Sequence, residues 1–175
     1  MTTKVLMDVQ EYLRTSFEDA DCEYLDGDVV ERNMGEVLHS GVQHVLERLL
    51  GRVARKLGLR ILPEIRIQIH SRRYRVADIA VWRAGDDIGQ KIPKKPPFLA
   101  IEILSPQDRI VRMQAKIEEY LSIGVQWVWL LDPEEKKAIY YSRKNPGGSP
   151  CEVLKTEDPA VEIPLSKVWA ALEGM

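Results

Sequence analysis

The 175-residue chain predicts an α+β fold with an α/β-type core, in which helices flank a mixed β-sheet. Helix and strand patterns follow one another in the order helix, three-strand meander, helix, strand. The central strands are apolar on both sides, as strands are when helices cover both faces of a sheet. The closing strand–helix–strand step predicts a right-handed crossover, and therefore a parallel pair within the sheet.

The composition is that of an ordinary globular protein, with 45% hydrophobic and 30% charged residues. A chain of this length predicts one domain, which we expect to span residues 1–175. Its apolar runs are shorter than the roughly 20 residues that cross a bilayer, and the first residues lack a secretory signal. Cys22 and Cys151 lie far apart, which suits neither a zinc site nor a disulfide framework. We therefore expect a cytoplasmic protein without a membrane partner.

The first part of the chain predicts a short helix, a hairpin and a long helix. The short helix is expected over residues 5–16, where apolar residues recur on one face. The hairpin turns at Asp26-Gly27, since Asp-Gly is among the strongest short hairpin signals. Residues 39–57 place apolar side chains at helical spacing, and Gly58 is expected to end that helix.

Three strands form the predicted meander, over residues 61–70, 74–83 and 97–105. Each is rich in β-branched and aromatic residues and is bounded by charged residues, Pro or Gly. A tight turn at residues 71–73 joins the first two strands, and a loop rich in Gly and Lys joins the second to the third.

The second half of the chain predicts a helix over residues 110–124, a buried strand at 125–132 and a further strand at 137–143. Residues 145–150, which contain two prolines and two glycines, are expected to form an exposed loop. The chain is expected to end in a short helix with Ser166 as its N-cap.

The charge is distributed unevenly, although the formal net charge is only -2. Residues 1–31 hold nine acids against two bases, whereas residues 48–83 hold ten Lys or Arg against two acids. A basic zone beside an acidic site would suit a polyanion such as nucleic acid. The plainer interpretation is a solvated helix face plus a charged turn, and the pI of about 6.0 argues against tight non-specific binding of nucleic acid.

Two acidic residues, Asp78 and Glu102, lie inside apolar strands where a carboxylate is unusual. An ionised carboxylate that is buried without a partner costs several kcal/mol, so such groups are normally paired, protonated or bound to metal. Strand alternation places Asp78 on a face with Ala80, and Glu102 on a face with Phe98 and Ala100. If the two strands pair with these faces aligned, the carboxylates meet at one end of the sheet.

Two carboxylates that meet in this way predict a site for Mg²⁺ or Mn²⁺, because these cations prefer oxygen ligands. The backbone carbonyl of Ile103 could supply a further ligand. Such a metal activates water and offsets charge at phosphorus in phosphodiester hydrolysis. The alternative is a structural pair of acids, neutralised by Arg75, Arg109 or Lys116.

Several stretches of the chain resemble the Uma family of restriction-endonuclease-like proteins, a bacterial group within the PD-(D/E)XK nuclease superfamily. The resemblance runs from about residue 8 to residue 140. It rests on His39 at the start of a helix, on Lys116 with Tyr120, and on the segments EYLDGDVVE, LPEIRIQI, VADIAVW, PPFLAIEILSPQDR and GVQWVWLLDP.

This resemblance implies a restriction-endonuclease-like fold and a magnesium-dependent endonuclease that acts on nucleic acid. It implies that Asp78 and Glu102 bind the metal and act in catalysis, with Lys116 as the catalytic lysine. Glu64 on the first core strand would be an accessory acidic or hydrogen-bonding residue. His39 is either an ordinary helix-start residue or an accessory residue that lines the site.

The sequence also departs from the family pattern. Leu104 stands where the superfamily has a lysine, two residues after the second acid, so the positive charge must come from elsewhere. Lys116 is the candidate for that charge. Arg112 stands one helical turn before Lys116, where the family often has an acid, and Ala77 replaces a proline.

Three functions remain open on the sequence. The first is a metal-dependent endonuclease acting on DNA or RNA, in which Lys116 steadies developing charge or orients the water. The second is a catalytically inactive nuclease-fold protein that binds nucleic acid or a protein, which Leu104 and Arg112 favour. The third is a structural homodimer built on the Trp- and Tyr-bearing strands near the C-terminus, and a dimer is the common state of small proteins.

Overall fold

The computed structural model describes residues 6–17, 22–32, 36–89 and 91–175. The core runs helix, three strands, helix, strand, as predicted. The described helices and strands are, in chain order, α1 (Val9–Arg14), β1 (Glu23–Leu25), β2 (Asp28–Val30), α2 (Val37–Leu57), β3 (Leu59–His70), β4 (Arg73–Arg83), β5 (Leu99–Ile103), α3 (Ile110–Ser122), β6 (Trp127–Asp132), β7 (Lys137–Ser142), β8 (Asn145–Pro150), β9 (Val153–Lys155), β10 (Glu162–Pro164) and α4 (Leu165–Glu173).

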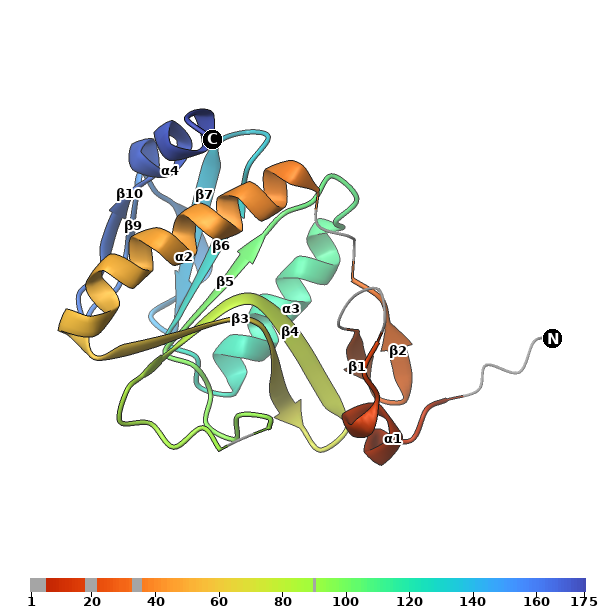
Figure 1. Cartoon of the computed structure of the whole chain (residues 1–175). Helices are drawn as coiled ribbons and strands as arrows, with labels where there is room; N and C mark the ends of the chain where they lie inside the picture. The colour runs from red at the N-terminus through yellow and green to blue at the C-terminus, as the bar shows by residue number, and fades with distance from the viewer. Residues whose placement is uncertain (1–5, 18–21, 33–35, 90) are drawn as a thin grey trace.

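One mixed sheet forms the centre of the molecule. Its strand order is β2-β1-β4-β5-β6-β7-β8, and β3 pairs with β4 beside that path. β3, β4 and β5 pair antiparallel, whereas β5 and β6 pair in parallel across α3. In Figure 1, α2 crosses in front of the sheet and α3 lies behind it. The mixed sheet flanked by helices, with its parallel pair, is therefore confirmed.

Two apolar clusters fill the two faces of this sheet. On one face Leu46 and Leu50 of α2 pack with Ile101 of β5, and on the other Ile117 of α3 packs with Ala80 of β4. Helix α2 ends where the sequence predicts, because Gly58 adopts a left-handed φ of 61° that glycine tolerates without strain.

Asp78 and Glu102 have the strand parity of Ala80 and Ala100, whose side chains belong to the cluster under α3. Phe98 does not share this face as predicted. It precedes β5 and packs in the α2-side cluster instead.

The structure corrects the prediction for residues 145–150, which form strand β8 instead of a loop. Among the described strands β8 pairs with β7 alone, so it lies at the edge of the sheet, where prolines without an N–H are tolerated. Gly148 adopts a φ of 73°, and a Cβ there would lie 2.4 Å from the Tyr141 ring. Gly148 thus allows close packing on β7, which a pattern of prolines and glycines does not reveal.

The C-terminal helix also begins differently from the prediction. Its N-cap is Pro164, and Ser166 lies inside the helix. Strand β10, which pairs with β9, leads directly into α4 and thereby fixes the start of the helix. No helix in the described part of the chain is both long and apolar enough to span a membrane.

Candidate active site

The two acids lie where β4 and β5 separate. The strands pair through Val81↔Leu99, Ala80↔Ala100 and Ile79↔Ile101, and the pairing ends one position before the acids. Beyond that point a side chain of β4 bonds the backbone of β5, because Asp78 Oδ2 accepts the Ile103 N–H at 2.7 Å. The strand opening therefore makes room for a site between them.

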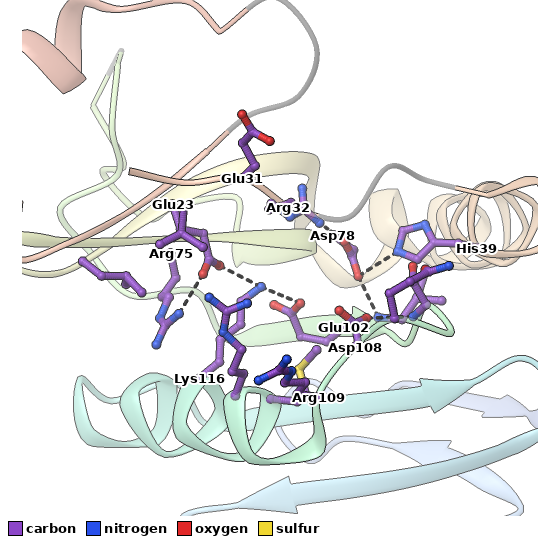
Figure 2. Close-up of a pocket in the computed structure, with 17 residues that line it drawn as sticks. Glu23, Glu31, Arg32, His39, Arg75, Asp78, Glu102, Asp108, Arg109 and Lys116 are labelled. Carbon is purple, nitrogen blue, oxygen red and sulfur yellow. Dashed lines mark hydrogen bonds and ion pairs between the residues drawn. The ribbon is translucent and has the colours of Figure 1, made fainter. Parts of the chain in front are cut away.

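Asp78 and Glu102 are each only 1% exposed, and both line one cavity of about 130 Å³. Figure 2 shows their carboxylates in this cavity, with side chains from β1, α2 and α3 around them. The structure thus brings together the two acids that the sequence singles out. Ile103, Lys116 and His39 line the same cavity.

Glu102 is held by two donors from α3. Lys116 Nζ lies 2.7 Å from its Oε2, and the Tyr120 hydroxyl donates to its Oε1 at 2.8 Å. The two donors stand four residues apart, so the helix presents them on one face. Burial raises the pKa of Glu102 to about 7, with the Asp78 charge adding to the rise and the Lys116 charge opposing it.

Lys116 uses all three of its ammonium hydrogens inside the protein. Besides Glu102, it donates to the Val76 carbonyl at 2.7 Å and lies 3.0 Å from Glu23 Oε1. Burial lowers the pKa of Lys116, but the charges of Glu102 and Glu23 outweigh burial and raise it. Lys116 therefore brings a positive charge from α3 into contact with Glu102.

Glu23 of β1 is a site residue that the sequence analysis missed. Its Oε2 accepts from Arg75 Nη1 at 2.7 Å, and its Oε1 accepts the Val76 N–H at 3.2 Å. Burial would raise the pKa of Glu23, but Lys116 and Arg75 outweigh burial and lower it to about 2. Arg75 also pairs with Glu119 at 2.6 Å, so the network extends from the cavity into α3.

Asp78 has a different set of partners. Its Oδ1 accepts from Arg32 Nη2, and His39 Nε2 of α2 lies 3.3 Å from its Oδ2. Burial would raise the pKa of Asp78, but the hydrogen bond to His39 and the charge of Arg32 keep it below its ordinary value. His39 is buried in this contact, so it lines the site and is more than a helix-start residue.

Glu64 lies beside Asp78 with an unusual backbone. It falls between Pro63 and Ile65 of β3, which pair with the residues on either side of Asp78. Its φ is 47°, a left-handed conformation that a non-glycine residue rarely adopts within a strand. Gln43 of α2 donates to Glu64 Oε1 and to the Asp78 carbonyl, each at 3.1 Å.

Arginines near the site divide into two groups. Arg73 and Arg75 pair with acids of the hairpin and of α3, so they are used inside the protein. Arg109 and Arg112 are exposed, and they line the cavity at the start of α3. The sequence suggested Arg75, Arg109 or Lys116 as the residue that neutralises the two acids. Lys116 contacts Glu102. Asp78 is instead paired with Arg32, which the sequence did not suggest.

The donor set suits a small hard cation with few protein ligands. Mg²⁺ is typically held by one or two carboxylates, with waters and substrate phosphate completing its shell, and Asp78 with Glu102 offers such a pair. Among the described residues, no group of three or more His, Cys, Asp or Glu side chains is arranged to hold a metal. A metal bound here would therefore have these two carboxylates as its acidic ligands, and Arg32 already contacts one of the two.

A second cavity, of about 300 Å³, lies between α3 and strands β6 to β8. It is larger than the first and mainly apolar, and its charged lining residues Asp132, Lys137 and Glu152 are exposed or half-buried. Buried, interacting charged groups are the feature that marks chemical sites, so we assign the candidate site to the smaller cavity.

Residues 9–173 match the model of the Uma2 family, which is described as "Putative restriction endonuclease". The chain belongs to this family. Its structure is similar to the crystal structure of a protein described as "a putative nuclease belonging to DUF820" from Anabaena variabilis, with a TM-score of 0.80. The two are 22% identical, and the match covers 95% of this chain and 99% of that chain.

At this identity the likeness establishes a shared fold, so this member of the Uma2 family has a restriction-endonuclease-like architecture. None of the curated proteins matches the chain. The family and the fold together indicate a nuclease-like role.

Proposed function

We propose that this chain is a metal-dependent endonuclease that hydrolyses phosphodiester bonds of nucleic acid. The observation that carries the proposal is the meeting of two buried carboxylates and one buried lysine in a single cavity, at the opening between β4 and β5. Asp78, Glu102 and the Ile103 carbonyl would hold Mg²⁺ or Mn²⁺, which supplies water activation and charge neutralisation at phosphorus when bound.

The chain's own residues provide orientation and positive charge. Lys116 and Tyr120 fix the Glu102 carboxylate, and Lys116 is the buried cation placed to steady negative charge on a phosphate. Arg109 and Arg112, exposed on the same cavity, are suited to bind backbone phosphates on either side of the reacting one.

Calorimetric titration with MnCl₂ tests the metal site. We expect saturable binding by the wild type and none by Asp78→Asn, a substitution of nearly the same shape. Glu118→Gln is the control, because it removes an exposed acid of α3 that does not line the cavity. Absence of binding by the wild type at millimolar metal would contradict the proposal.

A nicking assay on supercoiled plasmid and on single-stranded oligonucleotide then tests turnover. We expect cleavage that needs Mg²⁺ or Mn²⁺ and disappears in Asp78→Asn and Glu102→Gln, while Glu118→Gln cleaves as the wild type does. Comparison of DNA with RNA substrates identifies the substrate class.

A binding module without turnover is the second candidate. It is favoured by the complete internal use of the Lys116 donors, which leaves none for a substrate unless a contact is given up. Metal binding and nucleic-acid binding without any nicking would select this function over the first.

A further inference from the structure

Arg32 lies between two acids at the edge of the candidate site. Its Nη1 contacts Glu64 Oε2 and its Nη2 contacts Asp78 Oδ1, so one guanidinium bridges two carboxylates from neighbouring strands. Its side chain is 17% exposed, and it follows β2 in the chain. Figure 2 shows Arg32 beside Asp78, with Glu102 below them on the side of the helix that carries Lys116.

The guanidinium places a positive charge directly against the Asp78 carboxylate. His39 contacts Asp78 as well, but an imidazole carries a full charge only when it is protonated. Lys116 is committed to Glu102 and Glu23. Arg32 is always charged, so in the metal-free protein it is the permanent cation in direct contact with Asp78.

The backbone of Glu64 is held in an unusual conformation at the contact between its carboxylate and Arg32. A left-handed conformation is unfavourable for a non-glycine residue. The φ of 47° nevertheless occurs in the middle of β3, next to Asp78, with the Glu64 carboxylate in contact with Arg32 and Gln43. Strain of this kind is found where surrounding contacts hold a residue for a specific role. Glu64 is therefore the second anchor of the guanidinium.

We propose that Arg32 is an internal competitor for the metal: in the metal-free protein it occupies the Asp78 carboxylate, and a divalent cation must displace it to bind there. The inference rests on the proposed function, because it takes Asp78 as a metal ligand. A guanidinium and a divalent cation both seek the same carboxylate oxygen, so binding of one opposes binding of the other. The site is thus autoinhibited at low metal concentration.

The test is MnCl₂ titration calorimetry at constant ionic strength on the wild type, Arg32→Gln and Arg112→Gln. We expect Arg32→Gln to bind Mn²⁺ about tenfold more tightly than the wild type, which corresponds to about 1.4 kcal/mol. Arg112→Gln is the matched control, since it removes the same charge from the same cavity without an ion pair to Asp78 among the described residues. Its affinity should change much less.

Each outcome separates the inference from the function on which it rests. The metal site and the competitor role are both supported if Arg32→Gln alone binds Mn²⁺, or if it binds Mn²⁺ more tightly than the wild type and Arg112→Gln do. Equal or weaker binding by Arg32→Gln, with saturable binding by the wild type, overturns the competitor role and leaves the metal site standing. An equal gain in Arg112→Gln also overturns it, because the effect is then general charge. No binding by any of the three overturns both.

Thermal unfolding provides a second measurement that does not depend on activity. Without metal, Arg32→Gln should melt below the wild type, because Asp78 and Glu64 lose their shared cation. Saturating Mn²⁺ should raise its Tm by more than it raises that of the wild type. A purely structural role for Arg32 predicts equal increments. If Arg32→Gln fails to fold, Arg32→Met takes its place, because it removes the same charge and keeps an unbranched side chain; unchanged affinity in that variant overturns the inference.

Discussion

The two acids of the candidate site differ in how their charge is balanced. Glu102 is surrounded by side chains from regular elements, and its partner Lys116 is itself fixed by Glu23 and Val76. Asp78 is balanced by Arg32, which lies outside the described helices and strands, and by His39 near the first turn of α2. The Glu102 half is a network of buried ion pairs between regular elements, and the Asp78 half is where we propose that a cation is exchanged.

The largest loss of unfolding free energy is expected on the Glu102 side of the site. Lys116→Met removes the shared partner of two buried carboxylates, and breaking a buried ion pair in this way costs about 3–5 kcal/mol. Chemical denaturation measures this loss of unfolding free energy. Lys137→Met is the control, because that side chain is 73% exposed and its ion pair contributes at most about 1 kcal/mol. A loss of unfolding free energy in Lys116→Met no larger than in the control would show that this ion-pair network does not stabilise the fold.

A pH-dependent loss of stability is expected from Glu23. Its folded pKa of about 2 lies below the ordinary 4.5, so its ionised form stabilises the fold fully above pH 4.5 and less as the pH falls towards 2. A shift of this size corresponds to roughly 3 kcal/mol. The difference in unfolding free energy between the wild type and Glu23→Gln should therefore shrink across this range.

Denaturation curves at a series of acidic pH values measure that difference. Glu118→Gln, at an exposed position of the same α3 helix that carries Lys116, should differ from the wild type by a small amount at every pH. A constant difference for Glu23→Gln would contradict its role as the acid that anchors Lys116.

A smaller effect is expected beside Asp78, at Glu64. Glu64→Gly and Glu64→Ala both remove the contact with Arg32, but only glycine relieves the left-handed backbone. We expect the glycine variant to be more stable than the alanine variant by about 1 kcal/mol. Arg60 is an exposed residue of β3 without a positive φ. There the alanine variant should be more stable than the glycine variant, because glycine weakens an ordinary strand. The same order at both positions would remove the evidence for strain.

Much of the fold could be predicted from the sequence, because its core elements have strong local patterns. The 3.6-residue spacing of α2, the apolar runs of β4 and β5 and the Asp-Gly turn each specify their own structure. The errors fall where tertiary pairing overrides a local signal. Prolines and glycines predict a loop at residues 145–150, but pairing with β7 makes a strand there. Ser166 suits an N-cap, but β10 fixes the start of α4 earlier.

The candidate site could be predicted only on the side of the central strands. Asp78 and Glu102 stand out because a carboxylate is unusual in an apolar strand, and the family resemblance adds Lys116, Glu64 and His39. Glu23 and Arg32 have no comparable local signal. They reach the site because the β1–β2 hairpin pairs with β4 through Tyr24↔Tyr74 and Leu25↔Arg73, a contact between residues about fifty positions apart.

That small hairpin joins the two halves of the site. Glu23 opens it and holds Lys116, and Arg32 follows its second strand and holds Asp78. The hairpin is held to β4 by two register pairs and by the ion pairs of Arg73 with Asp26 and of Arg75 with Glu23. A shift of this hairpin would therefore disturb the contacts of Lys116 and of Asp78 together, so two three-residue strands set the charge balance at both acids of the cavity.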